Sequence, residues 1–415
     1  MKRYLIIADD ITGSNDTGLQ LKRRGIDTVV TLEPASVGVQ DISYVLDTES
    51  RPFQGNDAFN LVYRAVSQIN LFKFDHIIKK VDSTLRGSIA WEIAAVDKAC
   101  APELIIFMPS LPDLGRTTID GVHLLHGTPV TQTELAKDPR TPVMQDNLKK
   151  MLEAVYDEPV THVNWSAIES GALDFSYGRV FSFDAVTNAH IQAVTGAAIK
   201  TGKRVLWVGT AGIVDNLLET EEPQLPAVAL IASLSETTRR QVRYAQEKGT
   251  DVVVVPTSAL IKKEKKLNDN NIKTIVDKAV EILRSRRDVI VISEASYDRA
   301  ALDKSVHTGV AMEEASSMVQ QQMGGIMANI LEHACVSGIF LTGGDTAMGF
   351  LNAINATGMR IVSEALIGIP LMRIVGGKYD NIKAITKAGA FGQDDALSFC
   401  LRKLKEKDEE RICLY

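Results

Sequence analysis

Four short clusters of polar residues and glycines carry the groups in this sequence that could bind or react with a ligand. The first reads ADDITGSNDTG over residues 8–18 and places Asp9 and Asp10 directly after an apolar run. Carboxylates at that position could accept hydrogen bonds from ligand hydroxyls or hold a cation. A structural interpretation is also open, in which one aspartate caps the following helix and the other lies in a solvated turn.

The second cluster, KKVDSTLRGS over residues 79–88, combines cations, a carboxylate, hydroxyls and a guanidinium group. A helix is expected to begin near Ser88, because Ile89 and Ile93 follow at helical spacing. Backbone N–H groups at a helix start bind anions, and Arg86 could hold a carboxylate or phosphate through two parallel hydrogen bonds. The structural alternative is a salt-bridged surface loop, but a position just after a predicted strand favours a binding site.

The third cluster, PSLPDLGRT over residues 109–117, also follows a predicted strand. Its prolines stiffen the loop, and Arg116 follows a glycine that permits a close approach of the backbone. A binding loop and a purely structural turn both fit this pattern.

The fourth cluster, TGGDT over residues 342–346, lies between a predicted strand and an amphipathic helix that we expect to end at Gly358. Paired glycines let a backbone close around phosphate oxygens, and the start of the helix supplies free N–H donors. Further glycine turns follow in VGGK over residues 375–378 and KAGAFG over residues 387–392. Three such turns close together in the sequence suit a nucleotide.

The clusters need a scaffold of strands and helices to bring them together. Short apolar, β-branched runs recur along the chain, and stretches with helical periodicity lie between many of them. This alternation predicts an α/β fold with mainly parallel sheets covered on both faces. The predicted strands are Tyr4–Ala8, Thr28–Leu32, His76–Lys80, Leu104–Met108, Val180–Phe183 and Arg204–Val208, and then Val228–Ala232, Asp251–Val255, Val289–Ile292, Gly338–Leu341 and Leu371–Val375.

A domain boundary is predicted at residues 219–226, because this stretch, ETEEPQLP, is charged and carries two prolines between the two strand series. We therefore expect two α/β domains, residues 1–222 and 226–415. A cleft between two domains is the default place for a ligand, so an interdomain active site is the expectation.

The composition narrows the class of protein. Lys plus Arg number 46 and Asp plus Glu 52, a formal net charge of −6, which disfavours a nucleic-acid-binding domain. The short run Lys262–Lys266 is therefore interpreted as a solvated loop. No apolar stretch approaches the roughly 20 residues that cross a bilayer, and the start MKRYLIIADD does not resemble a signal peptide. A cytoplasmic protein that binds neither membrane nor nucleic acid is expected.

Several familiar motifs are absent. The sequence has no GxGxxG or GxSxG, and GAAIKTGKR over residues 196–204 misses the Walker A spacing. His123 and His126 are three residues apart and would share one face of a helix, but the leucines between them favour packing over metal binding. The sequence leaves any metal ligands undefined.

The combination of ADDITGSNDTG, KKVDSTLRGS, PSLPDLGRT, TGGDT and KAGAFG resembles the four-carbon acid sugar kinase family, in the family's order from Asp9 to Gly392. The resemblance implies an ATP- and Mg²⁺-dependent kinase with an N-terminal sugar-acid-binding domain and a C-terminal nucleotide-binding domain. The opening TGSNDTG is most similar to members that phosphorylate the 4-hydroxyl of D-threonate. Relatives that act on D-erythronate or 3-oxo-tetronate more often read TGATD there.

The resemblance and the cluster chemistry together name the expected contacts. Residues expected to contact the acid are Asp9, Asp10, Arg51, Lys80, Val81, Asp82, Ser83, Thr84 and Arg86. Residues expected to contact the nucleotide are Ser233, Ser235, Gly343, Gly344, Asp345, Thr346, Gly377 and Gly389.

Phosphoryl transfer depends on positioning and charge neutralisation rather than on a protein nucleophile. Lys80, Arg51 or Arg86 would neutralise the acid's carboxylate, and either Asp345 or Asp82 would accept the hydroxyl proton. The partners expected are thus a small sugar acid and ATP, with a homodimer possible.

Two other classes of function stay open at this stage. One is a non-catalytic sugar-acid sensor, which the glycine turns disfavour because a sensor needs no phosphate-binding loops. The other is a dehydrogenase or aldolase acting on the same acids. The missing GxGxxG disfavours a dehydrogenase, and an aldolase of this kind would need a lysine that forms a Schiff base.

Overall fold

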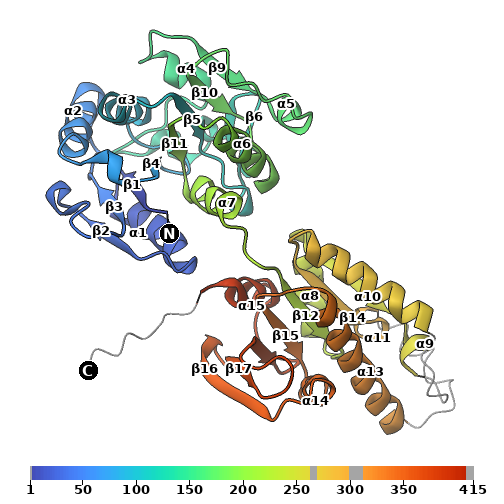
Figure 1. Ribbon diagram of the computed structural model, residues 1–415. Helices are drawn as coiled ribbons and strands as arrows, with labels where there is room; N and C mark the ends of the chain where they lie inside the picture. The colour runs from blue at the N-terminus through green and yellow to red at the C-terminus, as the bar shows by residue number, and fades with distance from the viewer. Residues whose placement is uncertain (1, 262–268, 299–311, 408–415) are drawn as a thin grey trace. The chain divides into compact units, whose positions relative to one another are not determined.

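The computed structural model of this chain describes residues 2–261, 269–298 and 312–407, and the predicted loop Lys262–Lys266 lies outside them. The chain divides into two compact units. Residues up to Pro223, together with Lys407, make the first unit, and Gln224–Glu406 make the second. Each unit has its own sheet (Figure 1) and its own hydrophobic core.

The first unit is built on a sheet of eight parallel strands in the order β2-β3-β1-β4-β11-β5-β10-β9. Its strands are β1 (Tyr4–Ala8), β2 (Thr28–Thr31), β3 (Ser43–Asp47), β4 (His76–Lys80), β5 (Leu104–Met108), β9 (Val160–Val163), β10 (Val180–Phe183) and β11 (Val205–Gly209). A small antiparallel sheet follows β5 and comprises β6 (Arg116–Ile119), β7 (Val122–Leu125) and β8 (Thr128–Pro129).

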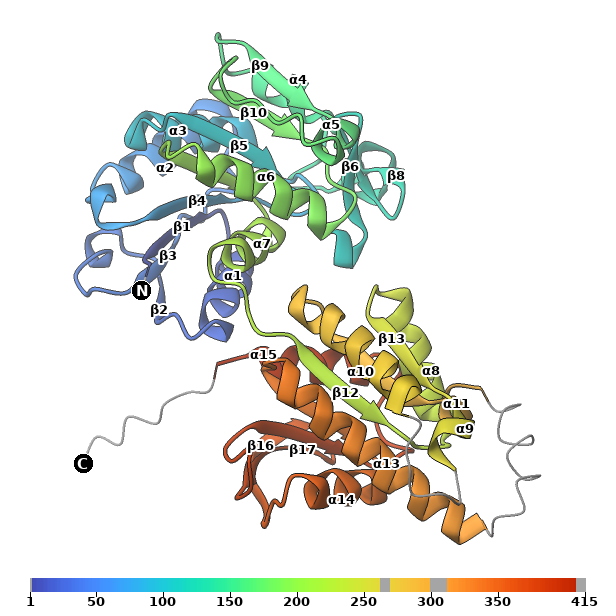
Figure 2. The same ribbon diagram turned by 45° about the vertical axis from the view of Figure 1, so that its right-hand side comes forward.

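Helices cover both faces of this sheet, because the side chains of each buried strand alternate between two apolar layers. On β1, Leu5 and Ile7 pack with residues of α2 and α3, whereas Tyr4 and Ile6 pack with residues of α1, α6 and α7. Figure 2 shows these two groups of helices on opposite faces of the sheet. The helices are α1 (Ile11–Arg23), α2 (Gly55–Val66), α3 (Ile89–Cys100), α4 (Leu148–Glu153), α5 (Trp165–Glu169), α6 (Asn188–Lys200) and α7 (Ala211–Glu221).

The second unit has a seven-stranded sheet in the order β13-β14-β12-β15-β18-β17-β16. The strands from β13 to β18 in this order are parallel, whereas β17 pairs antiparallel with both β18 and the edge strand β16. The strands are β12 (Ala227–Ile231), β13 (Asp251–Val255), β14 (Val289–Ser293), β15 (Gly338–Thr342), β16 (Gly358–Leu366), β17 (Ile369–Val375) and β18 (Lys383–Lys387). The helices are α8 (Glu236–Glu247), α9 (Thr257–Leu260), α10 (Asp269–Arg284), α11 (Glu294–Tyr297), α13 (Met312–His333), α14 (Gly344–Ala353) and α15 (Ala396–Lys405).

The two-domain α/β fold with mainly parallel sheets is confirmed. Each predicted strand coincides with an observed one to within two residues at either end. The strands β3, β9, β16 and β18 and the small sheet β6–β8 have no counterpart among the predicted strands. The predicted end of α14 was wrong: the helix stops at Ala353, Asn355 turns the chain with a φ of 56°, and Gly358 already begins β16.

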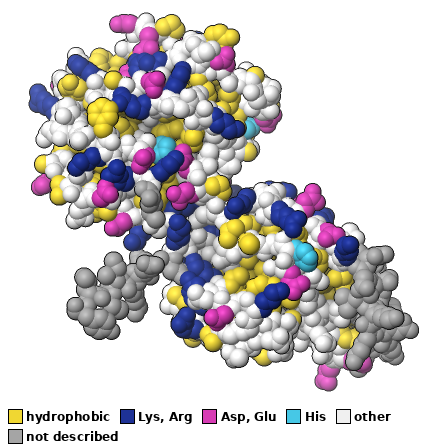
Figure 3. Space-filling view, in the orientation of Figure 1, with side chains coloured by type: hydrophobic (Ala, Val, Ile, Leu, Met, Phe, Trp, Pro, Cys, Tyr) yellow, Lys and Arg dark blue, Asp and Glu magenta, His cyan; other side chains and the backbone are white. Residues whose placement is uncertain are grey.

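The surface carries both basic and acidic side chains, as the formal net charge of only −6 predicts. Basic and acidic side chains are interspersed on the face seen in Figure 3, and the described residues show no extended basic surface there. Among the helices in the described ranges, none is long and apolar enough to cross a bilayer.

Candidate functional site

The first group of predicted site residues lies at the carboxyl edge of the eight-stranded sheet. From β1 the strand order runs to β3 and β2 on one side and to β4 on the other, so the chain reverses direction across the sheet at β1 and β4. Open α/β sheets bind ligands at such a reversal point. Asp9 and Asp10 follow β1, Arg51 lies in the segment after β3, and residues 80–86 continue from β4.

Arg51 joins these three segments. Its Nε and Nη2 donate to the two carboxylate oxygens of Asp9 at 2.6 and 3.1 Å, and its Nη1 donates to Asp10 at 2.7 Å. The Asp82 carboxylate lies 3.6 Å from the same guanidinium group. Burial opposes the charge on Arg51, but the hydrogen bonds and charges of these carboxylates raise its pKa above the usual value. Asp10 also caps α1 by accepting from the Gly13 N–H at 2.9 Å, so the ligand and helix-cap interpretations are compatible there.

Asp82 is the most heavily engaged carboxylate of the group. Arg86 binds it through two hydrogen bonds of 3.1 and 2.8 Å, and Thr84 donates both its N–H and its hydroxyl to it, at 3.0 and 2.5 Å. Burial alone would raise the pKa of Asp82, but the bonds to Arg86 and Thr84 and the charge of Arg51 hold it well below its usual range. Thr84 was expected to contact the acid, but its hydroxyl proton is already donated to Asp82.

Lys80 is also a cation at this edge, but no carboxylate of the described residues lies within ion-pair distance of its ammonium group. Its side chain is 5% exposed, and its ammonium donates to the Val81 carbonyl at 2.9 Å. Burial lowers its pKa, although Asp9, Asp82 and Asp10 act in the opposite direction. A Cβ on Gly13 would lie 2.9 Å from the ammonium, so glycine at the start of α1 leaves the space that Lys80 faces.

The neighbouring Lys79 points to the other side and is structural. It is fully buried and forms an ion pair of 2.8 Å with Glu92 of α3, while its ammonium also donates to the Lys80 carbonyl at 2.7 Å. Val81 is likewise buried in the apolar core, so its side chain is not available to a ligand. Ser83 is partly exposed, and its hydroxyl has no hydrogen-bond partner in the part of the chain that the structure describes.

A buried chain of hydrogen bonds holds the Ser83 backbone. His123 Nε2 lies 3.0 Å from the Ser83 carbonyl, its Nδ1 lies 3.0 Å from the Thr118 hydroxyl, and that hydroxyl lies 3.0 Å from the hydroxyl of Ser110. A carbonyl only accepts, so Nε2 carries the proton, Nδ1 accepts from Thr118, and Thr118 accepts from Ser110. Burial lowers the pKa of His123 to about 4, which keeps the ring neutral.

This chain of hydrogen bonds corrects the helical interpretation of the two histidines. His123 lies on β7 and His126 in the turn after it, so they share no helix face. His123 is buried and His126 is exposed. His123 also explains part of the third cluster, because Ser110 lies in the PSLPDLGRT loop, Thr118 follows it, and both connect the loop through His123 to Ser83. His126 is the residue that Gly115 of that loop approaches, since a Cβ there would lie 2.3 Å from the His126 ring.

Asp47 is a further carboxylate at the same sheet edge that was not among the predicted site residues, because it ends the unpredicted strand β3. It lies opposite Ala8 of β1 in register and is buried, and one carboxylate oxygen has no partner among the described residues. Burial raises its pKa to about 6. The signal available in the sequence was the run SYVLD followed by the polar segment TESR.

The second group of predicted residues lies at the corresponding edge of the seven-stranded sheet. The strand order reverses between β12 and β15, and Ser233 and Gly343 follow these two strands. Gly389 follows the next strand, β18, and its carbonyl accepts from the Ser235 hydroxyl at 2.9 Å. A Cβ on Gly389 would lie 2.7 Å from the Ser233 hydroxyl oxygen, so only glycine fits between these serines.

The glycine turn after β15 opens α14. Gly343 has a φ of 87°, which favours glycine, and Gly344 and Asp345 occupy the first turn of the helix. Asp345 is exposed and has no ion-pair partner in the described residues, whereas Thr346 is buried. The orphan N–H groups of this turn and the helix dipole suit an anion.

The structure does not bring Gly377 to this group. Because β17 runs antiparallel to β18, the turn after β17 lies at the opposite edge of the sheet from Gly343 and Gly389. A Cβ on Gly377 would lie 2.3 Å from the Ile354 carbonyl oxygen, so this glycine packs against the end of α14. Its role is a tight turn.

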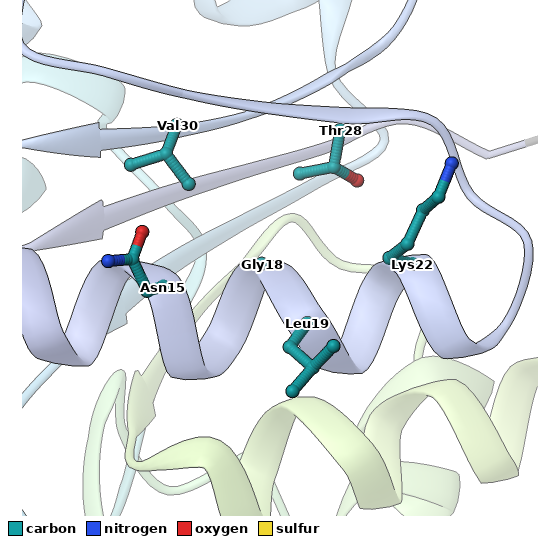
Figure 4. A pocket seen from close by; sticks show the side chains of 6 residues that line it. All are labelled: Asn15, Gly18, Leu19, Lys22, Thr28 and Val30. Carbon is teal, nitrogen blue, oxygen red and sulfur yellow. The ribbon is translucent and has the colours of Figure 1, made fainter. Parts of the chain in front are cut away.

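Two further features carry no site. Within residues 2–261, 269–298 and 312–407, no three His, Cys, Asp or Glu side chains converge to hold a metal ion. The groove of Figure 4 runs between α1 and β2 and is lined by none of the predicted site residues. Its lining residues are Asn15, Gly18, Leu19, Lys22, Thr28 and Val30.

The two units match two different known domain families. Residues 4–217 match a sugar-binding N-terminal domain, and residues 228–397 match a nucleotide-binding C-terminal domain.

Curated relatives span nearly the whole chain. The D-threonate kinase of Salmonella typhimurium is 32% identical and covers 97% of this chain and 99% of its own length. The D-erythronate kinase of Heliobacterium modesticaldum is 26% identical and covers 98% of both. A crystal structure from Bordetella bronchiseptica, described as a domain of unknown function with bound citrate and as a domain-swapped dimer, is 26% identical. It covers 97% of this chain and 99% of its own, with a TM-score of 0.60.

His123 is expected to contribute to stability near neutral pH. In His123→Phe the Ser83 carbonyl and the Thr118 hydroxyl lose their buried partner, which should cost about 1–3 kcal/mol of unfolding free energy. The folded pKa of about 4 lies below the ordinary 6.5, so the unfolded state binds the extra proton and the parent loses stability as pH falls between these values. The difference in unfolding free energy between the parent and His123→Phe should therefore become smaller as the pH approaches 4.

Urea unfolding measures this effect, because Trp91, Trp165 and Trp207 all lie in the first unit and tryptophan fluorescence follows its unfolding. His126→Asn is the matched control and should leave the midpoint near the parent's, since His126 is exposed and asparagine tolerates its φ of 49°. Equal stability of parent and His123→Phe at neutral pH would contradict the role of this hydrogen-bond chain.

Proposed function

Because this chain belongs to the four-carbon acid sugar kinase family, we propose that it transfers the γ-phosphoryl group of ATP to the 4-hydroxyl of D-threonate, giving 4-phospho-D-threonate and ADP. The family makes the protein a carbohydrate kinase, a phosphotransferase with an alcohol acceptor. The observation that carries the choice of acid is the full-length similarity to the Salmonella D-threonate kinase at 32% identity. The D-erythronate kinase at 26% and a 3-oxo-tetronate kinase of Cupriavidus necator at 25% are less similar.

In this proposal the acid binds at the carboxyl edge of the first sheet. Lys80 neutralises its carboxylate, because this ammonium has no carboxylate partner of its own in the described residues, and the Ser83 hydroxyl donates a further hydrogen bond. Asp10, with 23% of its side chain exposed, accepts from a ligand hydroxyl. Asp9 is 2% exposed and has both oxygens on Arg51, so it acts by orienting that guanidinium group. The citrate bound to the Bordetella relative is a small hydroxy acid of related chemistry.

The nucleotide binds in this proposal at the carboxyl edge of the second sheet. The first N–H groups of α14 and the backbone around Gly389 hold phosphate oxygens, and Ser233 and Ser235 shape the turn against which Gly389 packs. This assignment gives residues 1–222 to the sugar acid and residues 226–415 to the nucleotide.

Asp345 suits the role of proton acceptor better than Asp82. Asp82 has hydrogen bonds to Arg86 and Thr84, and its lowered pKa makes it a weak base. Asp345 is exposed at the start of α14, beside the proposed phosphate-binding N–H groups.

A bound Mg²⁺ would neutralise charge on the phosphates. Because no three His, Cys, Asp or Glu side chains converge in the described chain, the ion would be held mainly by phosphate oxygens and water, and the Asp345 carboxylate would serve either as its ligand or as the proton acceptor.

A substrate panel tests the proposed reaction. ADP formation should depend on the added acid, and kcat/KM should be highest for D-threonate among D-threonate, D-erythronate and 3-oxo-tetronate. A higher kcat/KM for another acid would reassign the substrate within the family. Tight binding of an acid without ATP consumption would instead support the non-catalytic sensor.

We also propose that this chain forms a homodimer, because the Bordetella relative crystallised as a domain-swapped dimer. Light scattering in solution tests this oligomeric state.

Ser83→Ala should raise KM for the acid while leaving KM for ATP unchanged. The hydroxyl is a free donor in the proposed acid site, and losing one hydrogen bond to a charged group costs roughly 10- to 100-fold in affinity. Steady-state kinetics with each substrate varied in turn measure the split. Ser67→Ala, at the end of α2, is the matched control and should change neither constant. A rise in KM for ATP alone would reverse the assignment of substrates to the two units.

Asp345→Asn should lower kcat by a factor on the order of 10²–10⁴, because a base or a metal ligand needs the carboxylate charge. Asparagine is otherwise compatible with the first helical turn, so the melting temperature should stay close to the parent's. The exposed Asp277 of α10 provides the control, and Asp277→Asn should keep the parent's kcat. Near-normal turnover of folded Asp345→Asn at saturating ATP, Mg²⁺ and D-threonate would reject the role and return it to Asp82.

A further inference from the structure

Lys387 is a buried cation at the end of β18 with an unusual set of partners. It is 2% exposed, and its ammonium donates to the carbonyls of Ala388 at 3.0 Å, Gly389 at 3.0 Å and Phe391 at 3.2 Å. No carboxylate of the described residues lies within ion-pair distance of it. An ammonium group has three protons, and all three are used on the turn formed by residues 388–392, which we call the Gly389 loop.

The Gly389 carbonyl accepts more hydrogen bonds than a loop carbonyl usually does. Besides Lys387, the hydroxyls of Ser235 and Thr238 donate to it at 2.9 and 3.1 Å. These donors come from β18 and from the start of α8, so the carbonyl is fixed toward the body of the unit. A carbonyl and the N–H of the same trans peptide point in opposite directions, and the described chain has no cis peptide. The Ala390 N–H is therefore directed away from these donors.

The Ala390 N–H has the properties of an anion donor. Ala390 is exposed, and its N–H has no hydrogen-bond partner in the described parts of the chain. The loop adjoins the turn before α14, because the Gly343 N–H donates to the Lys387 carbonyl at 2.9 Å. The free N–H groups of α14 and that of Ala390 thus lie at the same edge of the sheet.

We propose that Lys387 is a positioning residue for nucleotide binding: its ammonium group fixes the Gly389 loop in the conformation that presents the Ala390 N–H to a phosphate. Lys387 acts through the loop and not by contact, since its three protons are already donated to carbonyls. The inference rests on the proposed function, because the phosphate it concerns belongs to the nucleotide.

If Lys387 had only a structural role, its charged side chain would be expected to stabilise the folded unit. Its environment indicates instead that the charge destabilises the folded unit. Burial without a carboxylate lowers its pKa to about 8, so the folded unit disfavours the charge. Methionine has a similar volume and no charge to desolvate. Two of the three carbonyls also keep other protein donors in Lys387→Met: Gly389 keeps Ser235 and Thr238, and Phe391 keeps Gln241 at 3.0 Å.

Calorimetric titration of the full-length protein with ADP tests the proposal directly. Lys387→Met should raise the Kd for ADP about 10-fold or more, because a charge-assisted hydrogen bond that fixes the loop is lost. KM for the acid should stay unchanged, and the melting temperature should be no lower than the parent's. Lys387→Arg, which keeps a cation and several donors, should restore most of the affinity.

The second lysine of the same strand is the matched control. Lys383 lies at the amino end of β18, and burial also lowers its pKa to about 8. Lys383→Met removes an equivalent charge at the opposite edge of the sheet, so it should leave the Kd for ADP unchanged.

The pH dependence of ADP binding gives an independent readout. As pH rises through the Lys387 pKa of about 8, Lys387 loses its proton and one of its donors, so the parent's Kd for ADP should rise. Lys383→Met should keep this rise, and Lys387→Arg should abolish it. Cys400 of α15 is the titratable group that interacts with Lys387, and its pKa, raised by burial to about 12, keeps it neutral in this range.

Two results would overturn the proposal. One is parent-like ADP binding by folded Lys387→Met. The other is a loss of ADP affinity accompanied by a lower melting temperature and an equal rise in KM for the acid, which would make the role merely structural. If the parent itself bound no nucleotide, the proposed function would fail and this role with it, which the parent's own titration distinguishes from the other two results.

Discussion

The guanidinium group of Arg51, held by the carboxylates of Asp9 and Asp10 and lying beside Asp82, is the interaction on which the first unit's site depends. It joins the segments that follow β1, β3 and β4, which parallel pairing brings to one edge of the sheet. Its consequences extend to each neighbour. Asp9 and Asp82 are occupied with arginines, Asp10 connects Arg51 to the start of α1, and Lys80 is left without a carboxylate within ion-pair distance in the described residues.

The nucleotide site that we propose for the second unit has different chemistry on a similar scaffold. Its sheet also reverses strand order at the centre, but the groups there are hydroxyls, glycines and helix N–H donors rather than paired arginines and aspartates. Phosphates suit backbone donors at a helix start, and a small hydroxy acid suits a charged side-chain network. The types of group that each sheet edge presents are therefore the physical basis for our proposal that the first unit binds the acid and the second unit binds the nucleotide.

Local sequence patterns predicted many of the strands and the positions of the clusters, because buried strands such as β1, β5 and β15 are apolar runs that end abruptly in polar residues. They could not predict pairings between distant residues. Arg51 is 42 positions from Asp9, and His123 is 40 positions from Ser83, and nothing near either residue indicates its partner. Gly377 shows the same limit: a glycine turn is visible in the sequence, but the edge of the sheet at which it lies depends on the antiparallel β17, whose direction has no local signal.

The central claim is that the chain phosphorylates the terminal hydroxyl of a four-carbon acid, and the product itself tests that claim most directly. Phosphorus NMR of a reaction containing the protein, ATP, Mg²⁺ and D-threonate should show ADP and one new phosphate ester. Because the 4-hydroxyl is on a methylene carbon, the ester signal should be split into a triplet by the two attached protons. A doublet would place the phosphate on a secondary carbon, and inorganic phosphate without an ester would mean that no acid is phosphorylated; either result would contradict the account.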